Sequence, residues 1–331
     1  MHLRSHITGT GSFVPPRIVS NRELEGQLNT TDAWIRKKIG IEARRFVGEG
    51  VGTSDLALQA AKLALEAAKL HPSDVDCILV ATSTPDYQSP GVGTLLQHKL
   101  GCHKIPAFDI HNTSPGFIFA LELGDQLVRA GKYQCVLVVG AEIHSTALEM
   151  TERGRMMSVV FGDGAGAVVL EPTEGTHGLL STRLHSDGTY FDKLWCEAPG
   201  SIFHPWITPQ MIADGKTAPT MDGRFVFEKA VHAMGLVCEE VLVEQNFSEA
   251  DIDHVIPHQA NLRIIETIAQ NLKIPMKKVH TTIQKYGNTS SASIPITLDE
   301  AVRAGKIKKD ELILMTSFGA GLSWGAALIR W

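Results

Sequence analysis

The sequence repeats one series of landmarks in both of its halves, and this repeat restricts the fold more than any other feature. In the first half, Asp76 opens an apolar run and an NTS triplet at 112–114 begins 36 positions later. In the second half, Asp253 opens such a run and an NTS triplet at 288–290 begins 35 positions later. Each half then continues with another apolar run and a glycine-rich segment, at 161–170 and at 318–329. Four landmarks in one order indicate an internal duplication, with one half at 1–172 and the other at 173–331.

Short apolar runs separated by helical patterns indicate the secondary structure of each half. In the first half, Thr53 or Ser54 can cap a helix in which Leu56 and Leu63 recur, and Pro72 follows its end. Alternation of strands with helices of this length predicts α/β architecture with both faces of each sheet covered. We expect the buried strands at 77–81, 107–110, 135–139, 167–170, 254–256, 312–315 and 326–329.

Composition excludes several classes of protein. The chain has 331 residues with 44% hydrophobic content, which is enough for one large core or two smaller ones. The formal net charge of -5 comes from interleaved acidic and basic residues, so we expect no nucleic-acid partner. No signal-peptide core is present, and no stretch approaches about 18 consecutive apolar residues, so we expect a cytoplasmic protein without a membrane span.

The five cysteines are scattered and never form a CxxC pair. An odd number without paired spacing argues against a disulfide framework and against a structural zinc site. We expect free thiols, most of them buried, and no metal.

One long segment, at 186–222, has several prolines and glycines and little periodicity. We interpret it as an insertion over the mouth of an active site rather than a linker. A surface loop without function is an equally simple interpretation.

Ser114 stands where a strand passes directly into a helix, in the stretch FDIHNTSPGF at 108–117. Pro115 suits a first helical turn, so Ser114 should lie at a helix N-terminus, where its own N–H is available to an oxyanion. The simpler interpretation is that Ser114 caps the helix.

His258 and Asn288 occupy comparable places in the second half. His258 follows an apolar strand pattern, and Asn288 precedes a helix pattern that begins near 291. Ligands and catalytic groups gather at the carboxyl edge of strands in α/β sheets. Each residue alone is explained by a structural role, as a hydrogen-bonded histidine and as a cap. Together with Ser114 they predict one polar cavity, beside a close-approach backbone turn at 319–321 that is also explained as an ordinary hairpin.

Five motifs together resemble the 3-oxoacyl-acyl-carrier-protein synthase III family. These are FDIHNTSPGF, FGDGAGAVVL, PHQANLRI, YGNTSSASIP and SFGAGLSWGAALIRW, and they occur in the family's order across nearly the whole chain. The resemblance implies a thiolase-like, duplicated five-layer αβαβα fold, usually as a homodimer, with a Cys, His and Asn catalytic set. His258 and Asn288 match that set, and Ser114 stands at the position of the cysteine.

The resemblance also implies a reaction and substrate contacts. An acyl group from coenzyme A would pass to residue 114, with the N–H groups of Ser114 and Ala320 holding the oxyanion. A malonyl thioester would then be decarboxylated while His258 and Asn288 donate to its thioester oxygen. No cofactor is expected beyond the coenzyme A thioesters that serve as substrates.

Further positions carry over from the family pattern for substrate binding. Trp34 and Arg153 would stack on adenine, while Gly223 and Asn261 would line the pantetheine path. A core or surface tryptophan and a solvated arginine are the simpler interpretations of the first two. Ser89 replaces a phenylalanine that often closes the acyl pocket across the dimer, so we expect room for a longer or bulkier chain.

Docking of an acyl carrier protein is less clearly indicated. Glu228 lies where a basic residue is expected. Four basic residues could still form a docking patch for an acidic carrier protein, although a solvated helix face explains them equally well. They are Arg263, Lys273, Lys277 and Lys278.

Serine in place of cysteine leaves several functions open. A helix N-terminus favours a charge by up to about 2 kcal/mol, which makes a thiol substantially ionised but not a hydroxyl. Ser114 would therefore need His258 as a general base. It is a natural variant that still acylates, an engineered replacement, or the mark of an impaired homologue. The corresponding functions are decarboxylative condensation, acyl transfer to an oxygen or nitrogen acceptor, and a non-catalytic partner subunit.

Overall fold

The structure is a computed structural model that describes residues 3–331. Two mixed sheets form its centre. The first has the strand order β1-β7-β6-β4-β5, and the second has the order β11-β12-β13-β8. The strands are β1 (Leu3–Phe13), β4 (Cys77–Ala81), β5 (Ala107–Ile110), β6 (Val136–Glu142), β7 (Gly164–Glu174), β8 (Gly178–Ser186), β11 (His254–Pro257), β12 (Leu312–Gly319) and β13 (Ser323–Arg330).

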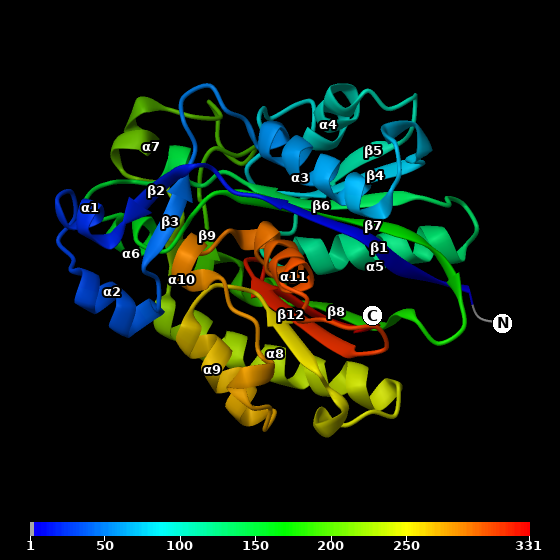
Figure 1. Ribbon diagram of the computed structural model, residues 1–331. Helices are drawn as coiled ribbons and strands as arrows, with labels where there is room; N and C mark the ends of the chain where they lie inside the picture. The colour runs from blue at the N-terminus through cyan, green and yellow to red at the C-terminus, as the bar shows by residue number, and fades with distance from the viewer. Residues whose placement is uncertain (1–2) are drawn as a thin grey trace.

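Helices cover both sheets in five layers (Figure 1). The outer faces are covered by α3 (Thr53–Ala68) and α4 (Val92–Leu100) on the first sheet, and by α8 (Gly223–Glu244) and α9 (Leu262–Asn271) on the second. Between the sheets lie α5 (Gly116–Arg129) and α11 (Ser293–Arg303). The order helix, sheet, helix, sheet, helix confirms the predicted five-layer αβαβα fold.

Smaller elements lie around this centre. Two small antiparallel sheets pair β2 (Arg17–Ser20) with β3 (Ala43–Phe46), and β9 (Leu194–Trp195) with β10 (Thr220–Met221). The short helices are α1 (Asn21–Glu25), α2 (Asp32–Ile39), α6 (Arg155–Ser158), α7 (Pro209–Ala213) and α10 (Ile283–Tyr286). The segment 186–222 thus contains α7 and the paired strands β9 and β10. Its covering of an active site stays a prediction.

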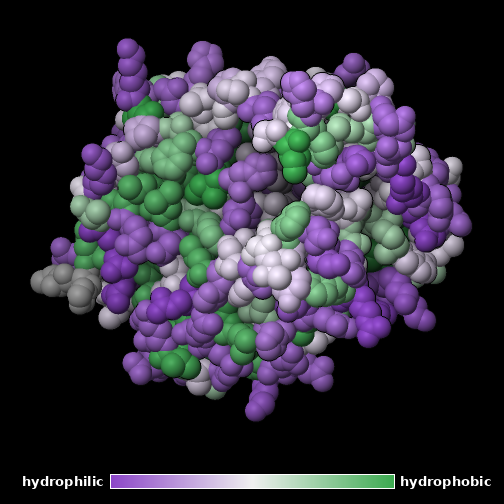
Figure 2. Space-filling model, turned by 180° about the vertical axis from the view of Figure 1, so that it is seen from behind, coloured by the Kyte–Doolittle hydropathy of each residue, from purple (hydrophilic) through white to green (hydrophobic). Residues whose placement is uncertain are grey.

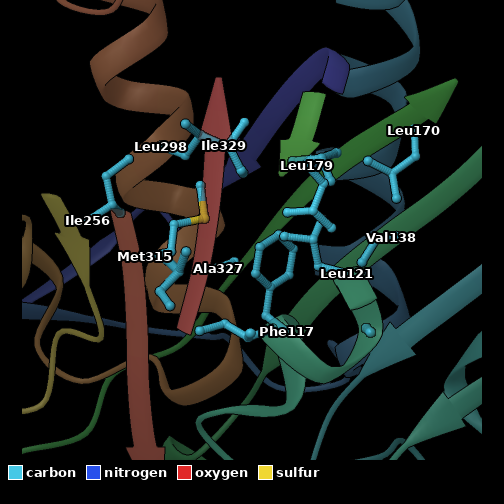
Figure 3. Close-up of a cluster of buried hydrophobic side chains, with 14 of the residues drawn as sticks. Phe117, Leu121, Val138, Leu170, Leu179, Ile256, Leu298, Met315, Ala327 and Ile329 are labelled. Carbon is cyan, nitrogen blue, oxygen red and sulfur yellow. The ribbon is translucent and has the colours of Figure 1, made fainter. Parts of the chain in front are cut away.

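The central core joins both halves of the chain (Figure 3). Phe117 and Leu121 of α5 pack there with residues from both sheets, among them Val138, Met315 and Ile329. The predicted division near residue 172 falls within β7, the last strand that the first sheet takes along the chain. Because the two halves share this core, the division as a domain boundary stays a prediction.

The two halves repeat the same contacts at a constant offset of 177 positions, which is 253 less 76 and also 312 less 135. The Asp76 N–H donates to the carbonyl of Cys135, and the Asp253 N–H donates to the carbonyl of Leu312. In return, the carboxylate of Asp76 accepts the backbone N–H of Cys135, and the carboxylate of Asp253 accepts the backbone N–H of Leu312. The duplication seen in the sequence is therefore a duplication of backbone structure.

The seven expected strands are all present, although most extend further than their apolar runs. The predicted cap of α3 is wrong, because Gly52 is the N-cap and Asp55 accepts its N–H at 2.9 Å. Thr53 and Ser54 lie inside the helix, where their hydroxyls bind the carbonyl of Thr84 and the carboxylate of Asp86. No helix within residues 3–331 is long and apolar enough to cross a membrane.

Candidate active site

Ser114 lies in the turn between β5 and α5, two residues before the helix begins. The N-cap of α5 is Pro115, and the turn closes when the Gly116 N–H donates to the carbonyl of Thr113. Interpretation of Ser114 as a helix cap is therefore wrong. Its Oγ lies 3.3 Å from the Oγ of Ser290.

The backbone at this turn is constrained. Thr113 has φ of 45°, in the left-handed region that side-chain-bearing residues seldom adopt. Ser290 has the matching φ of 48°, and each of these residues lies 37 positions after the aspartate of its half. The structural counterpart of Thr113 is thus Ser290, and the NTS triplets are out of register by one residue.

The turn at 319–321 approaches Ser114 from the second sheet. A Cβ placed on Gly319 would lie 2.7 Å from the Oγ1 of Thr113 and 3.2 Å from the Cβ of Ser114, so only glycine fits. Thr113 also donates to the carbonyl of Ala320 at 3.4 Å. Because this turn also joins the antiparallel strands β12 and β13, both interpretations of it hold.

Two backbone N–H groups of these adjoining turns have no partner in the described chain. Within residues 3–331, neither the N–H of Ser114 nor that of Ala320 donates a hydrogen bond. An unpaired N–H in a folded interior normally requires a partner. A developing oxyanion would supply one for both groups.

His258 is buried at the carboxyl end of β11. Its backbone N–H donates to the carbonyl of Thr316, and its Nδ1 lies 2.7 Å from the Oγ of Ser293. Burial, and to a smaller extent the charge of His144, lowers the pKa of His258 to about 3. The imidazole is therefore neutral at neutral pH.

The tautomer of His258 follows from its neighbours. The Gln259 N–H donates to the Ser293 Oγ at 3.3 Å, and that hydroxyl finds no acceptor in the described chain except His258 Nδ1. The hydroxyl then donates to Nδ1, which leaves the proton on Nε2. In this form the Nε2–H donates to no residue that the structure describes, and it is free to bind substrate.

Asn288 supplies a second free donor. Its side-chain Oδ1 accepts the Ser290 N–H at 2.8 Å, but the N-cap of the short turn at 290–292 is Thr289, so the interpretation of Asn288 as the cap is wrong. Its Nδ2 makes no hydrogen bond to any residue that the structure describes. The segment 288–293 therefore joins the three predicted residues, since Ser114 contacts Ser290 and His258 contacts Ser293. No hydrogen bond joins Ser114 to His258 in the described chain.

Buried groups behind this segment hold it in place. Ser291 donates to the carbonyl of Ala81 and to the carboxylate of Glu142, both at 2.9 Å. Gln259 accepts the N–H groups of Thr282 and Ile283 with its Oε1. These anchors fix the backbone on both sides of Asn288.

His144 is a residue of the site that the sequence interpretation did not include. It follows β6 at the same carboxyl edge of the first sheet, and its ring stacks on Phe161 with centroids 4.2 Å apart. Phe161 in turn forms a parallel bridge with Asn288. Burial lowers the pKa of His144, against the opposing charges of Glu142 and Asp163. Its place directly after a buried strand is the signal that could have indicated it.

No thiol replaces Ser114 as a ready nucleophile. All five cysteines are free, as predicted, and Cys77, Cys135 and Cys238 are buried. Burial raises the pKa of Cys77 to about 11 and the pKa values of Cys135 and Cys238 to about 12. These thiols stay protonated at neutral pH.

The residues expected to hold coenzyme A are spread over several elements, with Trp34 in α2 and Asn261 at the start of α9. Arg155, rather than Arg153, lies over the Trp34 ring, with its Cζ 5.9 Å from the centroid. Arg153 pairs with Glu149 at 2.6 Å and donates to the carbonyl of Ala213 in α7. A clamp of Trp34 and Arg153 on adenine stays a prediction.

The other residues expected to bind substrate either have a structural role or are exposed to solvent. Asn261 caps α9 by accepting the Arg263 N–H at 2.9 Å, and Gly223 is the first residue of α8. Ser89 is exposed in the loop between β4 and α4. The substrate roles of these residues stay predictions.

Only some side chains of the expected basic patch are exposed and without a hydrogen bond to the described chain. Lys273 and Lys277 are exposed, whereas the Nε of Arg263 donates to the carbonyl of Lys37 and Lys278 donates to that of Ile252. Glu228 pairs with Arg224 on the surface of α8 at 2.9 Å.

Two surface pockets lie elsewhere on the molecule. One is formed by α8 with β12 and β13 and is lined by Lys229 and Trp324, and the other lies beside the end of α3. Neither lining includes Ser114, His258 or Asn288. A tunnel for the thioester stays a prediction.

The layered fold and the polar site at the joined strand ends define a condensing enzyme of the thiolase fold. Family models agree: 3-oxoacyl-[acyl-carrier-protein] synthase III matches residues 108–188, and the C-terminal model of the same synthase matches residues 242–331. The chain belongs to the 3-oxoacyl-[acyl-carrier-protein] synthase III family. It is an acyl-transferring condensing enzyme of the transferase class.

Individual relatives cover nearly the whole chain. The beta-ketoacyl-[acyl-carrier-protein] synthase III of Thioalkalivibrio sulfidiphilus is 44% identical over 98% of this chain and 99% of its own length. A crystal structure of 3-oxoacyl-[acyl-carrier-protein] synthase III from Aquifex aeolicus is 41% identical, with a TM-score of 0.91 over 99% of this chain and 100% of that one. The priming beta-ketosynthase of the R1128 polyketide biosynthetic pathway is 32% identical, with a TM-score of 0.90 over 98% of this chain and 96% of that one.

Proposed function

We propose that this enzyme joins an acyl group from coenzyme A to a malonyl thioester, with Ser114 as the residue that carries the acyl group. The observation that supports this most is a set of four donors without a partner in the described chain, on segments that the Ser114–Ser290 and His258–Ser293 contacts link. Two are the N–H groups of Ser114 and Ala320, and two are the Nε2–H of His258 and the Nδ2–H of Asn288. A two-step reaction with an oxyanion in each step uses both pairs.

In the first step, the Oγ of Ser114 attacks the thioester carbonyl. The new C–O bond replaces the C–S bond, and the hydroxyl proton passes by way of His258 to the departing coenzyme A thiolate. His258 accepts a proton only with Nε2 unprotonated, so the Ser293 hydroxyl must rotate and accept from Nδ1–H. A hydroxyl both donates and accepts, and so it allows either tautomer.

In the second step, the malonyl carboxylate leaves as carbon dioxide. The electrons of the broken C–C bond form an enolate, whose oxygen is held by Asn288 and by His258. Before this step, His258 returns to its Nε2–H tautomer by proton exchange with solvent, and the Ser293 hydroxyl again donates to Nδ1. The enolate carbon attacks the acyl carbonyl on Ser114, the C–O bond breaks, and a proton from solvent restores the hydroxyl. This sequence needs no metal and no cofactor other than the thioester substrates.

We further infer the setting of the reaction. Malonyl bound to an acyl carrier protein is the proposed second substrate, and Lys273 and Lys277 are the exposed basic residues that suit an acidic partner. The enzyme is proposed to act in the cytoplasm, in fatty-acid or polyketide synthesis, as a homodimer.

Intact-mass spectrometry after exposure to acyl-CoA tests the role of Ser114. We expect an acyl adduct on the parent protein, a faster one by at least about tenfold on Ser114→Cys, and none on Ser114→Ala. An adduct that persists on Ser114→Ala, or none on either of the other forms, contradicts the proposal.

Product analysis with a malonyl thioester then separates condensation from its alternatives. A 3-oxoacyl product supports condensation. An adduct that passes only to an added alcohol or amine indicates an acyltransferase. No adduct on the parent or on the Ser114→Cys form would favour the partner-subunit interpretation.

A further inference from the structure

His144 has an unusual environment for a histidine. The residue as a whole is half-buried, but its Nε2 atom is buried and has no hydrogen-bond partner among residues 3–331. Buried polar atoms are nearly always paired, because an unpaired one loses its bond to water without replacement. The exceptions mark positions where a ligand completes the pairing.

The ring of His144 is held in one orientation. Its backbone N–H donates to the Oδ1 of Asp163 at 2.8 Å, and its ring stacks on Phe161 at an interplanar angle of 25°. Asp163 is itself buried and accepts three further hydrogen bonds from Val47 and Ser145. The stack on Phe161 restrains the ring, and the bond to Asp163 restrains the backbone that carries it.

The ring also lies beside the catalytic pair. Phe161, on which it stacks, pairs through its backbone with Asn288, and a charge on His144 is felt at His258. Coenzyme A enters from solvent, and the acyl group is the part of the thioester that passes beyond the reacting atoms into the protein. Because Nε2 is buried, the acyl group, rather than the nucleotide on the solvent side, is the part of the thioester that we infer to meet it.

Neighbouring side chains do not satisfy the free nitrogen. The carboxylate of Glu142, two residues before His144, is committed to the hydroxyls of Ser83, Thr84 and Ser291. An apolar acyl chain would leave Nε2 unpaired, whereas a hydroxyl would pair with it in either tautomer.

We propose that His144 selects acyl groups that carry a hydroxyl or oxo oxygen, by a hydrogen bond between that oxygen and its Nε2. A hydroxyl donates to Nε2 or accepts from Nε2–H, whereas an oxo oxygen accepts from Nε2–H. The inference rests on the proposed function, because it assumes that the acyl group is delivered to Ser114. It adds the chemical class of the acyl substrate.

Binding measured without turnover tests the selection by itself. On the Ser114→Ala background, calorimetry would compare hexanoyl-CoA with its 3-, 4- and 5-hydroxy counterparts and with 3-oxohexanoyl-CoA. We expect at least one oxygenated thioester to bind about tenfold more tightly than hexanoyl-CoA, since a site built to hydrogen-bond an oxygen rejects the analogue that lacks it.

Two substitutions separate hydrogen bonding from shape. His144→Leu should remove or reverse the preference, while His144→Gln, which keeps a polar atom near the position of Nε2, should retain part of it. His98→Leu, a change of an exposed histidine on α4, should leave the preference intact. Thermal unfolding of each variant checks that the fold is preserved.

The outcomes distinguish the selection from the underlying function. Equal binding of plain and oxygenated thioesters, or a preference that His144→Leu leaves unchanged, overturns the role of His144 alone. Absence of binding by every thioester overturns the proposed function as well. In the parent enzyme, acylation measured without malonyl thioester should follow the same preference; discrimination only in the second step would contradict it.

Discussion

At the scale of single residues, His258 is buried as a neutral imidazole, and this makes the stability of the fold sensitive to acid. Burial holds the pKa of this imidazole at about 3, whereas in the unfolded chain it is near the ordinary value of about 6.5. The unfolded state therefore binds more protons between these two values. Stability linked to His258 is fully present above about pH 6.5 and is lost progressively as pH falls towards 3.

We expect His258→Gln to reduce this sensitivity. The contribution of His258 to the loss of unfolding free energy between pH 7.5 and pH 5 is about 2 kcal/mol. Urea denaturation at both pH values should show a smaller difference for His258→Gln than for the parent. His98→Gln, on the exposed surface of α4, serves as control, and an unchanged difference in His258→Gln would contradict the neutral assignment.

The residues of the site differ in how far the sequence could predict them. Ser114, His258 and Asn288 each follow or precede a strand or helix pattern, so their meeting at one edge could be predicted. Ser293 sets the tautomer of His258, but in the sequence it is simply a serine near the start of a helical pattern. Only the three-dimensional contact reveals its partner. The one-residue shift between the NTS triplets shows that identical letters need not be equivalent backbone positions.

At the scale of elements, β1 escaped prediction because neither of its faces is apolar. On one face, Ser5 donates to the buried Asp125 of α5, while Thr10 and Ser12 donate to the buried Asp299 of α11. On the other face, glycines allow α3 to approach. A search for alternating apolar residues detects β4 and β6, which are buried throughout, but not a strand held by hydroxyl–carboxylate pairs.

The contact between β1 and α3 gives a stability prediction. A Cβ on Gly11 would lie 2.3 Å from the carbonyl oxygen of Ala60, which is backbone and cannot move aside. We expect Gly11→Ala to lower the free energy of unfolding by about 2–3 kcal/mol, the cost of overpacking a tight core. Urea denaturation measures the loss.

Gly48 provides the matched control for this change. A Cβ on Gly48 would meet no atom within 4 Å, and its φ is not in the left-handed region. Gly48→Ala should therefore leave the unfolding midpoint nearly unchanged. Equal effects of the two substitutions would mean that β1 and α3 lie further apart than described.

At the scale of the whole molecule, the duplication explains why the active site has contributions from both halves. Each half ends its central strands at one edge, and the turn of each half carries a residue with left-handed backbone, Thr113 or Ser290. These turns meet where Ser114 contacts Ser290. The first half thus supplies Ser114, the proposed acyl carrier, and the second supplies His258 and Asn288.

The same arrangement leaves β5 as an open edge of the first sheet, which we infer to be the dimer contact. Phe108 on this strand is 42% exposed, and Figure 2 shows a broad hydrophobic area on this rear side of the molecule. A hydrophobic edge strand is favourable only when another chain covers it. We expect the parent to have twice the 36.0 kDa mass of one chain by light scattering.

A lysine at position 108 should weaken that contact, because a charge would be buried without a partner. Phe108→Lys is expected to raise the dimer dissociation constant by at least about tenfold, so that monomer appears on dilution to low micromolar concentration. Val243→Lys, at an exposed position of α8, should keep the parent mass. A monomeric parent would contradict the dimer, and a Phe108→Lys protein that stays dimeric would place the contact on another face than β5.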